Sequence, residues 1–212
     1  MLAPTATVIA TWSAIVVSGA VDAYTATLTP VAPKTIYLQV GAGTFVGGNY
    51  NVGGQPAANT TVNTVSVTVP ATSMGSGTPL TMTTDSAATK SLLDGYVFCN
   101  LPNELYIGGF YRTAGGNTAA ALVVANVPAN LTDASGDTIP FSQIRWTSSG
   151  NGDGTNPQPF PAATFTAGAT QNVGAIASNQ WAESCLTFSY LNTKVPHAGT
   201  YSGVVTYTMS SP

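Results

Sequence analysis

The stretch Thr200-Tyr201-Ser202-Gly203-Val204-Val205-Thr206-Tyr207-Thr208-Met209 alternates between apolar and hydroxylated side chains. The apolar or aromatic members are Tyr201, Val205, Tyr207 and Met209, and the hydroxylated members are Thr200, Ser202, Thr206 and Thr208. Successive side chains of a β-strand point to opposite faces of its sheet, so a period of two indicates a strand with one buried face. We therefore predict a C-terminal strand at residues 200–209, with the apolar set facing the core.

Other parts of the chain show the same alternation, and no segment shows the 3.6-residue period of a long helix. Three further sets share a face: Val65, Val67 and Val69; Ile36, Leu38 and Val40; and Leu186, Phe188 and Tyr190. Additional strands are predicted at residues 23–29, 78–83, 104–111, 118–126, 139–147, 162–166 and 170–176. Segments rich in Gly, Pro, Asn or Asp separate them at 41–56, 133–137 and 148–161, and one helical turn is predicted near 85–93. Many short strands joined by turns indicate an all-β sandwich.

The chain carries very little charge. Only 6% of its residues are charged, whereas soluble proteins average about 25%. Five Lys and Arg residues in 212 positions form no basic stripe, which argues against binding nucleic acid or anionic membranes. No run is long and apolar enough to span a bilayer. A surface with few charges tends to self-associate, which suits the subunit of a polymer.

Cys99 and Cys185 are the only cysteines. A distant pair in a low-charge β-rich chain favours one disulfide, and the alternative is two buried thiols. Closing a loop of that size would stabilise the fold by about 4–5 kcal/mol if the effect is entropic. A disulfide would also place the protein in an oxidising compartment.

Residue patterns that carry catalysis or bind metals and cofactors are missing. His197 is the single histidine, is expected in an exposed turn, and has no nucleophile motif to serve. Asp153, in a Gly-Asn-Gly-Asp-Gly turn, is one carboxylate where Ca²⁺ requires several. Gly41-Ala42-Gly43 begins like a dinucleotide-binding loop, but Val46 stands where the third glycine belongs. We therefore predict no catalytic residue, no metal site, no cofactor and no enzymatic activity.

Two other residue types leave open questions. Trp12, Trp146 and Trp181 would supply a sugar-stacking platform if they were exposed, although buried core aromatics are the default interpretation. Asn59 and Asn130 stand in Asn-x-Thr sequons, which matter only in a host that glycosylates them.

The N-terminal residues 5–17 have the pattern of a long strand. One face carries Ala6, Val8, Ala10, Trp12, Ala14 and Val16, and is wholly apolar. Residues 1–23 resemble a signal peptide in hydropathy but lack the basic start of one, so we expect them to belong to the mature chain. A strand of this length is either the edge of its own sheet or is donated to another subunit.

The segment Ala198-Gly199-Thr200-Tyr201-Ser202-Gly203-Val204-Val205, with its continuation to Met209, resembles the final strand of chaperone–usher pilins. It is most similar to the major subunit of the alternate class, which has an A-G-x-Y-S-G-V-V pattern, and spore-coat-U-type pilins end in a related way. In that family each subunit is an incomplete immunoglobulin-like sandwich, and the N-terminal extension of a neighbour completes it.

The resemblance implies that the chain has two segments with different roles. Residues 1–20 would be a donor-strand arm, and residues 21–212 an all-β, immunoglobulin-like sandwich that lacks one strand. The face inserted into the neighbour would be Val8, Ala10, Trp12, Ala14 and Val16. The strand beside the acceptor groove would be the one that carries Tyr201, Val205, Tyr207 and Met209.

The function that we expect is structural. The chain would be a subunit of an extracellular bacterial filament (a pilus or fimbria) for adhesion or biofilm, exported through the periplasm. Its partners would be identical subunits joined head to tail, with a periplasmic chaperone and an outer-membrane usher. Two alternatives stay open: a carbohydrate-binding adhesin domain, and a viral or phage jelly-roll coat protein.

Overall fold

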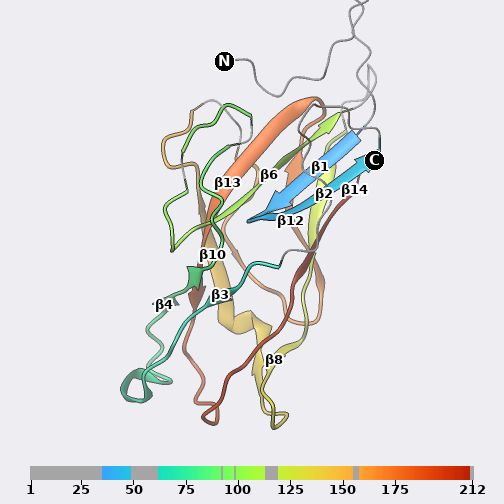
Figure 1. The fold of residues 1–212 in the computed structure, drawn as a ribbon. Coiled ribbons are helices and arrows are strands. Elements are labelled where there is room, and N and C mark those ends of the chain that lie inside the picture. Colours follow the sequence, from blue (N-terminus) through green and yellow to red (C-terminus); the bar gives the residue numbers. More distant parts are fainter. Residues whose placement is uncertain are drawn as a thin grey trace, which may run out of the picture.

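The computed structural model describes residues 35–48, 62–91, 93–97, 99–112, 119–154 and 158–210, and these residues are all-β (Figure 1). They contain no α-helix, only the two 3-10 turns η1 (Ala71–Ser73) and η2 (Phe141–Gln143). The arm at residues 1–20, its face Val8, Ala10, Trp12, Ala14 and Val16, the strand predicted at 23–29 and the proposed boundary near residue 20 lie outside the described residues.

The larger of two main sheets has seven strands. Its order is β11-β10-β13-β6-β1-β2, β4 also pairs with β13, and every pairing is antiparallel. The bounds are β1 (Thr35–Val40), β2 (Gly43–Gly48), β4 (Leu80–Thr81), β6 (Leu105–Arg112), β10 (Ile144–Ser149), β11 (Ala163–Thr164) and β13 (Gln180–Tyr190).

The smaller main sheet has three antiparallel strands in the order β12-β7-β14. Its strands are β12 (Thr170–Ile176), β7 (Ala121–Asn126) and β14 (Thr206–Ser210). Two short ribbons complete the described fold: β3 (Val65–Ser66) with β5 (Thr83–Thr84), and β8 (Asn130–Thr132) with β9 (Thr138–Pro140).

One apolar cluster joins the two main sheets and makes the molecule a sandwich. It includes Ile107 and Leu186 from the larger sheet and Val123, Ala125 and Met209 from the smaller one. The alternation read from the sequence produces this arrangement, because every second side chain of β7 and β14 is turned inward. The prediction of an all-β sandwich is therefore confirmed.

The other face of the larger sheet is also covered. Tyr37, Phe110 and Trp181 stack there with ring centroids 5.4–5.8 Å apart. Cys99, Tyr106 and Cys185 form a neighbouring buried group on the same sheet. Because β6 and β13 are packed on both faces, nearly all of their side chains are buried rather than every second one.

Several predicted elements differ from the structure. The turn predicted at residues 41–56 contains β2, which pairs with β1 in a hairpin through Gly41 and Ala42. No helix is present near 85–93 in the described residues. Residues 62–69 keep their alternation, with Val65, Val67 and Val69 against the core, but only β3 is paired. These are places where pairing, and not side-chain pattern, decides the structure.

The C-terminal strand is shorter than predicted. It begins at Thr206, which pairs with Asn126 at the end of β7, and not at Thr200. Pro128 follows two residues after Asn126 and has no N–H to extend the ladder. Tyr201 and Val205 therefore lie before the strand, although both still pack against the core with Tyr207.

Candidate functional site: the edge of the C-terminal strand

The strand β14 lies at the margin of the smaller sheet. It pairs with β7 along one edge, and no other strand among the described residues pairs with it. Met209 is buried and Tyr207 half-buried, while Thr206, Thr208 and Ser210 are exposed on the opposite face. Burial raises the pKa of the Tyr207 hydroxyl, as expected for a phenol held against apolar side chains. Within the described residues, one edge of the β14 backbone thus has no strand beside it, next to the inward side chains Tyr207 and Met209.

Several apolar side chains that pack on the core stay partly exposed in the described part of the chain. Most of the apolar residues that pack on the core yet stay partly exposed belong to β1, to residues 65–69 and to residues 201–207. They are Ile36, Val40, Val65, Val67, Val69, Tyr201, Val205 and Tyr207. The strand β1 lies against β14, and Figure 1 shows the two side by side at one end of the sandwich. A further strand here would bury surface that the described residues leave half-exposed.

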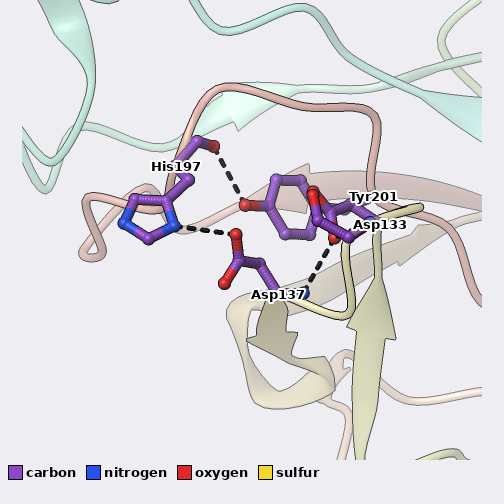
Figure 2. Close-up of polar contacts among 5 residues, drawn as sticks. Asp133, Asp137, His197 and Tyr201 are labelled. Atoms are coloured by element: carbon purple, nitrogen blue, oxygen red, sulfur yellow. Dashed lines mark hydrogen bonds and ion pairs between the residues drawn. The ribbon is translucent and has the colours of Figure 1, made fainter.

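The residues that precede β14 are fastened to the hairpin β8–β9. Ser202 and Thr132 exchange two backbone hydrogen bonds, of 2.9 and 3.0 Å. The imidazole Nδ1 of His197 lies 2.7 Å from Asp137 Oδ2, and the Tyr201 hydroxyl donates to the His197 carbonyl oxygen at 2.9 Å (Figure 2). Tyr201, predicted to lie in the strand, thus closes a loop before it.

The sole histidine has the exposed position expected from the sequence, with 83% of its side chain accessible. The hydrogen bond and the charge of Asp137 raise the pKa of His197. No hydroxyl in the described part of the chain is hydrogen-bonded to its other nitrogen. A hydrolytic triad would need a hydroxyl nucleophile at that second nitrogen.

The disulfide between Cys99 and Cys185 is present, as predicted. It joins the segment before β6 to the middle of β13, across 86 positions of sequence, and both cysteines are buried. The carboxylate of Glu104 and the two sulfur atoms lie within 4.8 Å of one another. Because the two sulfurs are bonded to each other, this group has no thiolate with which to ligate a metal.

The sequence did not point to the most deeply buried carboxyl group of the described residues. Glu183 of β13 is fully buried, and the Tyr106 hydroxyl donates a 2.7 Å hydrogen bond to its Oε2. Loss of hydration raises the pKa of Glu183, and the charge of Asp153 raises it further. Asp153 and Glu183 are both buried. The sequence signal that could have found Glu183 is an acidic residue among the mostly apolar residues of β13.

Two of the three tryptophans are core residues. Trp146 and Trp181 are buried, the first donating its ring N–H to the Pro161 carbonyl oxygen at 3.0 Å. Trp12 lies outside the described residues. Trp146 and Trp181 therefore do not form the exposed platform that a carbohydrate-binding domain would need.

No protein-family model matches the chain, and searches of curated proteins and of solved structures returned no match. No helix in the part of the chain that the structure describes is long and apolar enough to cross a membrane.

Proposed function

We propose that this chain is a structural subunit of an extracellular filament that is assembled by adding a donated strand to the edge of β14. The observation that carries the proposal is the one-sided pairing of β14 beside half-exposed core residues. In the proposal, the sandwich is immunoglobulin-like and incomplete, and a neighbouring subunit completes it.

Among the described residues, the free edge of β14 has none of the usual protections. Proteins usually blunt exposed edge strands with charged residues, proline or bulges, because such edges pair with other chains. The strand β14 has the sequence Thr-Tyr-Thr-Met-Ser, without a charge or a proline, and its register with β7 is regular. An edge with none of these protections is suited to β-strand addition, in which main-chain hydrogen bonds provide affinity.

The N-terminal arm also supports strand addition. Residues 5–17 would extend roughly 40 Å as a strand at about 3.3 Å per residue, which exceeds the length of β14 and the five residues before it. The apolar face of Val8, Ala10, Trp12, Ala14 and Val16 would cover the partly exposed side chains Val205 and Tyr207. Each subunit would insert its arm into the next, and such a head-to-tail contact propagates as a fibre.

Composition and redox state support export. A disulfide is compatible with an oxidising compartment such as the periplasm or the cell surface. Sparse charge favours close packing of identical subunits. The proposal includes a periplasmic chaperone and an outer-membrane usher as partners, with adhesion or biofilm as the role of the filament. It assigns no catalytic residue, metal or cofactor to the chain.

Deletion of the arm tests the proposal. Chain lacking residues 1–17 should stay monomeric, and a synthetic peptide of residues 5–17 should stabilise it, whereas the same peptide with Trp12→Asp should not, because it would bring an unpaired charge into an apolar groove. Polymerisation is read by negative-stain microscopy and by sedimentation. Normal fibres from the truncated chain would refute the proposal.

Two neighbouring positions provide a matched pair of variants in the full chain. Val205 packs on the core and is half-buried, while Thr206 is exposed on the other face. Val205→Asp should block strand addition, and Thr206→Asp should leave it intact. If both variants polymerise like the parent chain, the edge of β14 is not the acceptor.

A further inference from the structure

The segment 191–205 joins β13 to β14, and it is bound to the hairpin β8–β9 on the way. We call the C-terminal clip the contacts made there by Thr132, Asp133, Asp137, His197, Tyr201 and Ser202. Two backbone hydrogen bonds join Thr132 and Ser202, and the His197–Asp137 contact lies at 2.7 Å (Figure 2). The clip therefore combines a backbone contact that does not depend on pH with a side-chain contact that involves a titratable group.

Close packing confirms that the two segments are in direct contact. A Cβ atom on Gly199 would lie 2.9 Å from Asp133 Oδ2, and one on Gly203 would lie 3.2 Å from Leu131 Cδ2 of β8 and 2.6 Å from the ring of Phe141, which follows β9 in η2. Only glycine permits an approach of this kind without displacing the neighbouring group. The C-terminal segment is thus seated on the hairpin from residue 197 to residue 203.

The hairpin side of the clip is held by its own hydrogen bonds. The Asp133 carboxylate accepts hydrogen bonds from the backbone N–H groups of Ser135 and Asp137, at 3.0 and 2.8 Å, and from the Ser135 hydroxyl at 2.9 Å. These bonds close the turn and hold the backbone of Asp137 in position. His197 consequently meets a carboxylate whose place is set by the hairpin and not by the C-terminal segment.

We propose that the C-terminal clip is a pH-responsive fastening for the start of β14, firmer when His197 is protonated and weaker when it is neutral. The fastening itself follows from the contacts above. Only its consequence, that pH would modulate strand addition, rests on the proposed function.

The charged and titratable groups around the imidazole, among the described residues, are Asp137 and Asp133 on the hairpin and Tyr201 on the C-terminal segment. Both carboxylates favour the imidazolium and raise the pKa of His197. A raised histidine pKa gives stability that is fully present below the ordinary value of about 6.5 and is lost as pH rises through the higher folded pKa. Because the pair is exposed, the effect is local and modest.

Hydrogen exchange of the unpolymerised full chain tests the fastening. Protection factors, corrected for the intrinsic effect of pH on exchange, are compared at pH 5.5 and 8.5 for a peptide covering residues 197–206. We expect protection to fall about two- to five-fold at the higher pH, as for an exposed ion pair. A peptide from β10 is the internal reference and should not change.

His197→Gln, which does not titrate, should abolish the pH difference, and Asp137→Asn should do the same. Equal protection at both pH values in the parent chain, or an unchanged difference in His197→Gln, would overturn the proposal. Binding of the 5–17 peptide to the chain that lacks residues 1–17 is measured separately at both pH values. If exchange depends on pH but peptide binding does not, the pH-responsive clip is supported and its effect on assembly is contradicted. If the peptide binds at neither pH, that result counts against the proposed function alone.

Discussion

The Tyr106 hydroxyl donates a 2.7 Å hydrogen bond to Glu183, and both side chains are completely buried. They lie on the outer face of the larger sheet, and Tyr106 belongs to the same buried group as the Cys99–Cys185 disulfide. Burial raises the pKa of both groups, most strongly that of Tyr106, because neither anion is well solvated there. A carboxyl group in such a place is a source of pH-dependent stability.

Glu183→Gln should stabilise the protein increasingly as pH rises. A carboxyl group whose pKa is higher in the folded than in the unfolded chain makes its full contribution to the free energy of unfolding below its ordinary pKa. That contribution is lost as pH rises through the raised value. Glutamine keeps a hydrogen-bond acceptor for Tyr106 and does not titrate. Urea unfolding at pH 4 and pH 8 measures the difference between parent and variant, which should be small at pH 4 and favour the variant at pH 8.

Glu183→Ala is the matched control for that variant. It removes the acceptor and leaves the Tyr106 hydroxyl buried without this partner, at a cost of about 1–3 kcal/mol. If Gln and Ala destabilise the protein equally at pH 8, the hydrogen bond and the charge do not have the roles given to them here.

Removal of the disulfide should lower stability substantially. The bond closes a loop of 86 positions, for which the chain-entropy account gives about 4–5 kcal/mol. The double variant Cys99→Ser with Cys185→Ser should show a correspondingly lower denaturant midpoint without a change in fold by circular dichroism. A loss below about 1 kcal/mol would show that the unfolded chain is already restrained near these residues.

Asn192 should also contribute to the free energy of unfolding, although the sequence analysis did not select it. Its backbone has φ of 55°, and the side chain bonds to the Gly75 N–H at 2.9 Å, the Ser73 carbonyl at 2.7 Å and the Ser76 hydroxyl at 3.0 Å. Asn192→Ala loses these bonds and adds strain, and should cost about 2–4 kcal/mol. Thermal and urea unfolding measure the loss.

Asn192→Gly separates the two contributions. Glycine accepts the positive φ but makes none of the side-chain bonds, so its cost should fall below that of alanine by about 1 kcal/mol. An Ala variant as stable as the Gly variant would mean that backbone strain contributes nothing at this position.

The sequence predicted best where pattern and pairing agree. The strand expected at 170–176 is β12 with the same bounds, and the strand expected at 104–111 is β6 shifted by one residue. The disulfide followed from counting cysteines, and the geometry of the described fold brings their Cα atoms to 5.5 Å. Residues 133–137 form the predicted turn, because Asp133 hydrogen-bonds to the backbone within it.

The strand bounds and side-chain contacts that the sequence did not predict depend on residues that are distant in the chain. The start of β14 depends on where its partner β7 ends, at Asn126, far away in the chain. The Gly-rich β2 is a strand because β1 pairs with it. The contact between His197 and Asp137 spans 60 positions, and that between Tyr106 and Glu183 spans 77. Neither has a local signature, since only the pairing of strands brings such residues together.

The most direct test of the account is hydrogen exchange of the chain lacking residues 1–17, recorded residue by residue with and without the 5–17 peptide. The two outer strands of the smaller sheet provide an internal comparison, because β12 and β14 each pair with β7 and both lie at its margins. We predict that the peptide slows exchange in residues 206–210 and leaves the outer edge of β12, residues 170–176, unchanged. Protection at β12 instead, or no protection at either strand, would contradict strand addition at β14.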